Sequence, residues 1–505
     1  MKLSADPITG TPWNTPSTLL LGAIFFLLTL FLYTRANTFS AEYHPDEACK
    51  AKQVMQNEYN FHHPMLMLSV AKIALKGSAA GDSVQRTTIT GRWVSAFFTA
   101  AAIFCLTLMV SELYGTFAAA AAGLLLAANT QIFELAHYFK EDPALLFGMS
   151  TLFLAFALYD RSQSLPHLVF LGIATGLAIS GKYVGALAAP AAAVLLVLAP
   201  GGRRIWWNLL VWIGVTVLVF ALVNLPLFLN PAGFTSGFER ELGFAISGHK
   251  GITRSVPHGV YGAVFREATN PVIWILLIVF AFGIVFRAGR ARRSEWILAL
   301  FPICFAIVLS FSPKTHHRYF LPDTALLLAA AAGGICMLPR FRWNGRLISG
   351  GTSPILLCSS VLLIALATGA PKFVSVFNGF QNDGRNVLAR YLREHAAVGS
   401  TVIQDTKVNL EALDLPLHVE NGTFAADAGS LDDLRSRGIV YVAVAEGSYG
   451  RFFSDHLKPT SDGAADYKRR HAFYEQLFKE GNLVFECKAG TLQYLQPHLE
   501  LYRIQ

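Results

Sequence analysis

Long apolar runs recur through about three quarters of the chain, and they constrain its fold more than any other feature. A transmembrane helix needs about 20 mainly apolar residues, and most of these runs approach that length. Only 15% of the 505 residues are charged, whereas soluble domains have about a quarter. The sequence therefore predicts a polytopic α-helical membrane protein with about 11 transmembrane helices. We expect them at 17–34, 93–110, 117–135, 143–159, 166–180, 184–199, 205–228, 271–286, 295–311, 319–338 and 354–371.

Arginines in the short loops between these runs predict the orientation. They occur at Arg161, at Arg203 and Arg204, from Arg287 to Arg293, and from Arg340 to Arg346. If the N-terminus lies inside the cell, all of these loops face the cytoplasm, as the positive-inside rule requires. Because the basic residues are spread over loops, the formal net charge of +8 indicates contact with anionic membrane lipid and no nucleic acid partner. We therefore expect a multi-pass protein of a bacterial inner membrane with a cytoplasmic N-terminus.

Three longer segments then fall on the periplasmic face, at 35–92, at 229–270 and after 372. The first holds two amphipathic patterns, at 46–59 and 64–76. These form either a platform beside a site at the membrane edge or the ordinary packing of a long loop. We expect a transmembrane domain over 1–372 that carries the amphipathic loop 35–92 on its outer face.

After residue 371 the composition changes to that of a soluble domain. Helical patterns at 383–397 and 466–480 alternate with strand-like runs at 401–403, 439–445 and 483–486. This alternation predicts a small extracytoplasmic α/β domain over 373–505. No glycine-rich phosphate loop or nucleophile elbow occurs in its sequence, so we assign it no chemistry.

Charged and aromatic residues gather at the outer membrane edge in this topology. They adjoin the predicted helices at Asp46 and Glu47, at Lys140, Glu141 and Asp142, at Lys182 and Tyr183, and at Lys314, His316, His317, Arg318 and Tyr319. Each group has a plain structural explanation: a helix N-cap, a short loop, a lysine that reaches the headgroups, or an interfacial anchor. Random loop charges would not be expected to sort to one face, so we expect a functional site there.

The sequence does not indicate a metal or cofactor site. His62 and His63 are adjacent, so their side chains diverge, and no third ligand has a suitable spacing. Among the six cysteines, Cys49 and Cys487 lie outside the apolar runs, and any pairing between them depends on the fold. We assign no cofactor and no metal, and leave a divalent ion open.

Carboxylates and cations at a membrane edge suit a lipid substrate that carries a phosphate. Cations stabilise the negative charge that grows on a departing phosphate. A carboxylate accepts the proton of an attacking hydroxyl group. Arginine binds phosphate through two parallel hydrogen bonds, and lysine acts as a point charge. The residues therefore indicate a reaction on a lipid phosphate that needs a base.

Four segments in order resemble the C class of integral-membrane glycosyltransferases. They are HPDE after the first run, YFKEDPALLF between the third and fourth, GKY before the sixth, and SPKTHHRYFLPDTALLL at the tenth. The most similar patterns are those of protein O-mannosyltransferases and of the aminoarabinose and galacturonic-acid transferases that modify lipid A. The resemblance covers the membrane part of the chain. It implies a polyprenyl-phosphate sugar as donor and a lipid, glycan or protein as acceptor, with inversion at the sugar.

The resemblance also implies roles for individual residues. Asp46 is the expected catalytic base and Asp142 the second acid of the site. The carrier phosphate is expected to contact Lys140, Lys182, Lys314 and Arg318, and the other substrate-binding candidates are Glu47, His62, Glu141, His317 and Tyr319. Members of the class often have a Lys-Pro-Pro-Leu type stretch after the first motif. This chain has Phe61-His62-His63-Pro64-Met65-Leu66 instead, which leaves the sugar and the acceptor open.

Two other functions fit a polytopic chain. A transporter or flippase of lipid-linked sugars would place ionisable residues near the middle of the bilayer and would often show internal repeats. Here the charges lie at one edge and no repeat is visible, so the sequence favours a transferase. A non-catalytic assembly protein is the third interpretation, and it predicts that Asp46 is dispensable.

Overall fold

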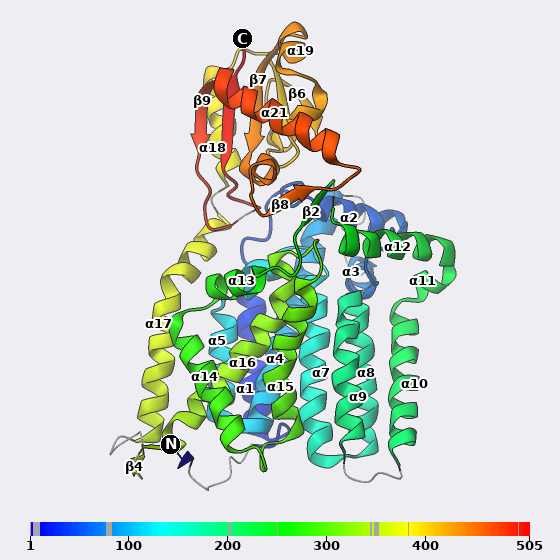
Figure 1. Cartoon of the computed structure of the whole chain (residues 1–505), viewed down its shortest axis with the longest axis vertical. Coiled ribbons are helices and arrows are strands. Elements are labelled where there is room, and N and C mark those ends of the chain that lie inside the picture. Colours follow the sequence, from blue (N-terminus) through cyan, green and yellow to red (C-terminus); the bar gives the residue numbers. More distant parts are fainter. Residues whose placement is uncertain are drawn as a thin grey trace.

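The structure is a computed structural model that describes residues 2–3, 11–76, 83–199, 204–249, 251–343, 346–347, 353–381, 383–492 and 494–505. Helices form one long bundle, and a smaller sheet domain stands at one end of it (Figure 1). The chain begins at the end of the bundle that lies opposite this domain (Figure 1). Arg203, from one of the expected cytoplasmic loops, lies outside the described residues.

Every expected apolar run falls on a helix or on two consecutive helices. The helices of the bundle are α1 (Pro16–Tyr33), α4 (Val84–Tyr114), α5 (Thr116–Ala127), α6 (Thr130–Ala136), α7 (Asp142–Ser162), α8 (Leu165–Gly181), η1 (Tyr183–Ala188), α9 (Ala189–Val197), α10 (Ile205–Val223), α13 (Val260–Ala268), α14 (Pro271–Phe286), α15 (Arg293–Ser310), η3 (His317–Phe320), α16 (Leu321–Met337) and α17 (Pro354–Gly379). The multi-pass α-helical fold class is thereby confirmed.

The expected number of crossings is higher than the number of long helices. In the described part of the chain, 7 helices are long and apolar enough to cross a membrane, or 9 if two bent pairs count as single spans. The bends are 61° between α5 and α6 and 112° between α13 and α14. The remaining two expected runs fall on the shorter apolar helices of 165–181 and 183–197.

Close packing of small residues brings α7 and α8 together near the sheet domain. A Cβ atom at Gly148 would lie 2.5 Å from the Ala178 Cα, and one at Gly181 would lie 2.7 Å from the Ala144 carbonyl. Small residues allow such close approach of helix backbones in membranes. The first residue of α7 and the residue after α8 are therefore held side by side. By contrast, α10 and α17 are largely exposed along their apolar lengths, which suits contact with lipid.

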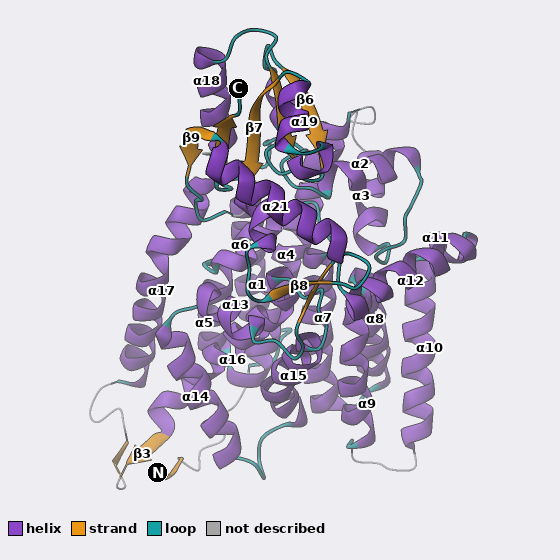
Figure 2. Ribbon diagram, turned by 45° about the horizontal axis from the view of Figure 1, so that its top comes forward, coloured by secondary structure: helices purple, strands orange, loops and turns teal. Residues whose placement is uncertain are grey.

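Short elements lie at the end of the bundle that carries the sheet domain (Figure 2). They are α2 (Glu47–Gln56), α3 (Leu66–Lys76), α11 (Leu225–Leu229), α12 (Pro231–Ser247) and β2 (Ile252–Arg254). The first two of these helices match the two amphipathic patterns expected in the loop 35–92. Strand β2 pairs with β8 (Leu457–Pro459) of the sheet domain in antiparallel register, so the two parts of the chain share a ladder of hydrogen bonds.

The sheet domain contains a five-stranded mixed sheet in the order β6-β5-β7-β10-β9. Its strands are β5 (Thr401–Asp405), β6 (His418–Gly422), β7 (Ile439–Ala445), β9 (Asn482–Cys487) and β10 (Leu499–Arg503), and its helices are α18 (Gly384–His395), α19 (Leu431–Ser436), α20 (Glu446–Tyr449) and α21 (Ala464–Glu480). Strand β5 runs parallel to β6 and β7, and β10 runs antiparallel to β7 and β9. The expected α/β character is confirmed. Helix α17 continues to Gly379, past the expected boundary at 372.

The remaining elements are short. At the N-terminal end of the bundle, β1 (Lys2–Leu3), β3 (Phe341–Trp343) and β4 (Arg346–Leu347) form a small sheet after η4 (Leu338–Arg340). The sheet domain also holds η5 (Leu410–Leu413), η6 (Ala425–Ala428) and η7 (Gly450–Phe452).

Candidate active site

Asp46 lies at the N-cap of α2, where the bundle meets the sheet domain. Its carboxylate forms an ion pair with Lys140 and lies 3.6 Å from Arg318 Nη1. The two cations hold the pKa of Asp46 well below its usual range. Its side chain nevertheless remains 43% exposed. Asp46 is therefore an ionised carboxylate that a substrate can reach.

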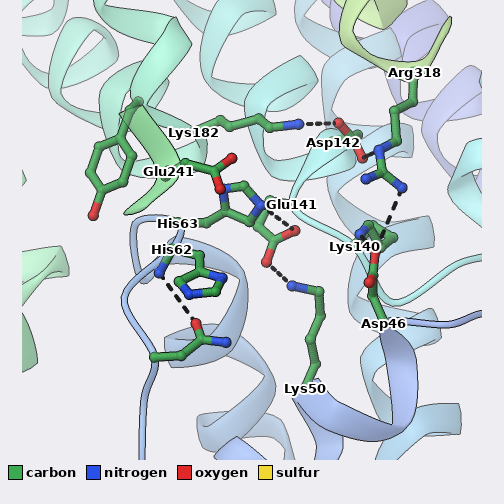
Figure 3. A network of polar contacts seen from close by, with 12 residues as sticks. Asp46, Lys50, His62, His63, Lys140, Glu141, Asp142, Lys182, Glu241 and Arg318 are labelled. Carbon is green, nitrogen blue, oxygen red and sulfur yellow. Dashed lines mark hydrogen bonds and ion pairs between the residues drawn. The ribbon is translucent and has the colours of Figure 1, made fainter. Parts of the chain in front are cut away.

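Asp142 is the first residue of α7, and Pro143 follows it in the first helical turn. Its Oδ1 accepts a hydrogen bond of 2.8 Å from Lys182 Nζ, which the close packing of α7 on α8 brings beside it. Arg318 Nε lies 3.8 Å from the other oxygen, Oδ2. Lys182 Nζ also lies 4.0 Å above the ring of Tyr319. Arg318 thus connects the two acids that the sequence predicts as catalytic (Figure 3).

A second group of charged side chains lies beside this network (Figure 3). Glu141 forms a buried ion pair with Lys50 of α2, and one of its oxygens lies 4.0 Å from His63 Nε2. Glu241 of α12 pairs with Lys314. Burial and the nearby lysines lower the pKa of His63 to about 3. His63 is therefore neutral at physiological pH, and the charge of this group resides on its lysines and glutamates.

The Glu47 carboxylate turns toward Arg92 of α4, and its expected role in substrate binding stays a prediction. Its carboxylate is fully buried and accepts two hydrogen bonds from Arg92, from Nε at 2.9 Å and from Nη2 at 2.6 Å. It also accepts one from the backbone N–H of Phe139 at 2.6 Å. Because neighbours on a helix point about 100° apart, Asp46 and Glu47 face different surroundings. Glu47 fastens α2 to α4 and to the loop that carries Lys140.

Two of the expected histidines lie at the margin of this network. His62 is half-buried beside His63 (Figure 3), and its backbone N–H donates to Asn60 Oδ1 at 3.2 Å. His317 accepts a hydrogen bond from Gln131 through its backbone carbonyl at 3.0 Å. The ring of His317 packs on that of His316 with 4.4 Å between centroids. The hydrogen bonds of His62 and His317 described above involve backbone atoms, so these two residues hold the loops around the ionic network more than they extend it.

Three residues of the network are absent from the residues expected at the site. Lys50 lies one helical turn after Asp46, so its place on the same face of α2 is visible in the sequence. His63 adjoins the expected His62. Glu241 comes from a long loop segment without a recognisable motif, and only the packing of α12 brings it to Lys314.

A cavity of about 670 Å³ lies between the bundle and the sheet domain, directly above Arg318. Lys314, Arg318 and Tyr319 line it from the bundle, and Pro45 brings the Asp46 loop to its wall. Its lining also includes Lys407 and other residues of the sheet domain. The size is ordinary for a ligand pocket. The charged network is therefore open to a polar ligand.

Within the described ranges, one group of three side chains has an arrangement suitable for a metal ion. It consists of Glu486 on β9 and of His498 and Glu500 at β10. These residues belong to the sheet domain and are separate from the Asp46–Arg318–Asp142 network.

Comparisons with known proteins identify a matching family model and solved structures of similar fold. Residues 83–227 match the family model described as dolichyl-phosphate-mannose-protein mannosyltransferase. The matched segment contains Lys140, Asp142 and Lys182, whereas Asp46 and Arg318 lie outside it. No curated protein matches the chain.

Two solved structures share the fold over nearly the whole chain. The structure of ArnT from Cupriavidus metallidurans bound to undecaprenyl phosphate is 14% identical, covers 95% of this chain and 97% of its own, and gives a TM-score of 0.55. The archaeal oligosaccharyltransferase AglB from Archaeoglobus fulgidus, in complex with an inhibitory peptide and a dolichol-phosphate, is 11% identical, covers 92% of this chain and 73% of its own, and gives a TM-score of 0.54. The family match confirms the resemblance to C-class membrane glycosyltransferases and the enzyme class, a glycosyltransferase. The two solved structures show that this chain shares their fold.

Proposed function

We propose that this glycosyltransferase moves a sugar from a polyprenyl-phosphate donor to a hydroxyl group of a lipid, glycan or protein, on the periplasmic face of a bacterial inner membrane. One observation carries the proposal: Asp46 is an accessible, ionised carboxylate whose partners, Lys140 and Arg318, are cations of the kind that hold phosphate. The match of residues 83–227 to a family that takes its name from a dolichyl-phosphate sugar supports this donor class. Undecaprenyl phosphate and dolichol-phosphate in the two similar structures support it further.

In the proposed reaction, Asp46 acts as the base. The acceptor oxygen attacks the anomeric carbon and gives its proton to the Asp46 carboxylate. The bond from that carbon to the phosphate oxygen breaks, and its electron pair leaves with the polyprenyl phosphate. Attack opposite the leaving group inverts the anomeric configuration. The phosphate leaves as an anion, so cations that contact it take the place of the general acid of an inverting glycoside hydrolase.

The pairing of Asp46 with Lys140 and Arg318 makes it a poor base before the donor binds, because the two cations hold its pKa low. A donor phosphate would compete with Asp46 for the same two cations. Once they turn to the phosphate, less positive charge acts on Asp46 and its basicity rises. This favours an order in which the donor binds first, because Asp46 can then accept the proton of the acceptor hydroxyl more readily.

Asp142 has a different part in the proposal. It is fully buried and lies beside Lys182 and Arg318. A buried carboxylate in this position fixes the direction of both cations and offsets their desolvation. Asp142 therefore holds Lys182 and Arg318 ready for the carrier phosphate.

The test uses the full-length protein in lipid nanodiscs. Polyprenyl-phosphate lipids extracted from the native host are added together with an envelope extract, and mass spectrometry follows the loss of the lipid-linked sugar and the gain of its mass on an acceptor. We expect loss and gain with the native protein and with Glu58→Gln, an exposed carboxylate beyond the end of α2. Asp46→Asn is expected to reduce both by about a hundredfold or more. No sugar transfer by the native protein, or transfer by Asp46→Asn at the native rate, would contradict the proposal.

A further inference from the structure

The cavity above Arg318 has a second basic side that the proposed reaction does not use. Six lysine and arginine residues but only two glutamates line it among the described residues. Lys314, Arg318 and Arg385 have carboxylate partners in Glu241, in Asp46 and Asp142, and in Asp383, respectively. Arg254, Lys407 and Arg451 line the side formed by β2 and the sheet domain, where Asp405 is the carboxylate that acts on Arg451. We call these three residues the upper cluster.

Arg254 lies in the strand pair β2–β8, which joins the membrane part of the chain to the sheet domain. It is the last residue of β2 and lies opposite Leu457 of β8, and both residues line the cavity. Its Nε and Nη1 atoms are buried, and neither has a hydrogen-bond partner within the described part of the chain. A buried donor without a partner is costly, and the cost is greater for a charged group. A ligand with acceptor oxygens would remove this cost.

Lys407 and Arg451 converge on one turn of the sheet domain. Lys407 Nζ donates to the carbonyl of Gly447 at 2.6 Å, and Arg451 Nη2 lies 3.4 Å from the same oxygen. Arg451 Nε donates to the carbonyl of Ser448 at 3.1 Å. Two like charges held at one carbonyl repel each other, and an anion between them would relieve that repulsion.

We propose that the upper cluster binds an oxyanion of the acceptor, either a phosphate or a carboxylate, while the acceptor hydroxyl lies toward Asp46. This inference rests on the proposed function and adds to it the chemical class of the acceptor: an anionic glycan or lipid headgroup. The cavity volume of about 670 Å³ accommodates a sugar that carries such a group. The donor phosphate uses the cations of the bundle, and the acceptor anion uses those of the upper cluster.

The test measures binding of three probes to the full-length protein in nanodiscs by calorimetry: a hexose 6-phosphate, a hexuronate and the neutral hexose. We expect at least one anionic probe to bind more tightly than the neutral hexose. Arg254→Gln and Arg451→Gln should each weaken that probe by about tenfold or more, since each removes a charge-assisted contact. Arg254→Lys should recover part of the affinity. Arg240→Gln, an exposed arginine of α12 outside the cavity, is the matched control and should change nothing.

Binding of polyprenyl phosphate alone, measured with the native protein and with Lys182→Ala, reports the proposed function separately. If this lipid binds and depends on Lys182, but the anionic probes bind no better than the neutral hexose, the inference is wrong and the proposed function stands. Equal affinity of the probes for the native protein and both glutamine variants would overturn it as well. If polyprenyl phosphate does not bind at all, the proposed donor fails instead. Whichever of the two anionic probes binds more tightly indicates whether the oxyanion of the acceptor is a phosphate or a carboxylate.

Discussion

Arg318 Nη1 lies 3.6 Å from Asp46 Oδ2, so the candidate base and a candidate phosphate ligand are already in contact without any substrate. The same guanidinium reaches Asp142, 3.8 Å away through its Nε. Arginine can offer several N–H groups to different oxygens in one plane. A phosphate that binds Arg318 therefore changes the surroundings of both acids at once. Such coupling links donor binding to activation of the base.

Asp46→Asn should abolish turnover while donor binding is kept. The amide preserves the shape of the side chain and cannot accept the hydroxyl proton, so the rate should fall by about a hundredfold or more. Since Lys140 and Arg318 lose their competing carboxylate, polyprenyl phosphate should bind at least as tightly as before. Single-turnover rates and lipid binding in nanodiscs measure the two effects. Normal turnover of this variant would refute the assignment of the base.

Glu47→Gln should act on stability and not on the chemical step. It leaves Arg92, which is fully buried, without its charged partner. Loss of one member of a buried ion pair costs about 3–5 kcal/mol, so the thermal unfolding temperature in detergent should drop clearly. Glu58→Gln, at an exposed position, should leave it unchanged. A Glu47→Gln protein with normal thermal stability and no turnover would show that Glu47 belongs to the reaction after all.

Arg318→Ala and Lys182→Ala should weaken use of the lipid donor. In the proposed reaction each variant loses a charge-assisted contact with the carrier phosphate, worth about 1.5–3 kcal/mol, which corresponds to about ten- to a hundredfold in kcat/KM. Arg318→Lys should recover only part of the loss, because lysine cannot make the paired contact. Kinetics with purified polyprenyl-phosphate sugar measure these effects. Unchanged kcat/KM in both alanine variants would indicate that these cations merely anchor the chain at the membrane edge.

The orientation of the chain predicts which positions a membrane-impermeant thiol reagent reaches from outside the cell. In a background that carries both Cys49→Ser and Cys487→Ser, Val398→Cys in the sheet domain should react in intact cells, because Val398 is 84% exposed. Gly289→Cys, in the arginine-rich loop after α14, should react only after permeabilisation. A Cβ atom at Gly289 has no neighbour within 4 Å, so this substitution leaves the fold unstrained. Labelling of Gly289→Cys in intact cells would place this loop outside the cell and contradict the proposed orientation.

The convergence of Asp46, Lys140, Asp142 and Lys182 could be expected from the sequence because each lies at the end of an apolar run. Helices that cross a layer in alternating directions bring every second connection to the same face. The order of the runs therefore determines which loops meet, before any side-chain contact is known. The ends of α8 agree with the expected run 166–180 to within one residue, whereas nothing in the sequence indicated the 61° bend that divides the run 117–135 into α5 and α6.

The sequence does not show which way an individual side chain points, so contacts between segments that are distant in sequence could not be predicted from it. Glu47 and Asp46 are adjacent in sequence, and only the position of Arg92 on α4 shows that Glu47 turns inward. Arg254 lies in a segment without a periodic pattern, and its place at the cavity depends on the pairing of β2 with β8. The α/β pattern of the sheet domain likewise contains no sign that Lys407 faces the membrane part.

The pH dependence of donor use should come from Lys140. Burial, together with the nearby Arg318, lowers the pKa of Lys140 from its usual value to about 8. Above that pH, Lys140 loses the proton that gives it its charge, so kcat/KM for the donor should fall as the pH rises through about 8. The pKa of Asp46 is held well below its usual range, so this carboxylate stays ionised and causes no loss on the mildly acidic side.

The donor and the acceptor do not obscure this effect. A sugar linked through a phosphodiester carries a single negative charge across this pH range, and an acceptor hydroxyl does not titrate in it. A phosphate monoester on the acceptor would titrate at about pH 6, well below the expected decline. In Lys140→Arg, the guanidinium stays protonated at every pH that the protein tolerates, so the alkaline decline should disappear while activity near neutral pH is partly kept. Initial rates at low donor concentration between about pH 6 and 10 decide the matter. An unchanged alkaline decline in Lys140→Arg would mean that another group controls donor binding.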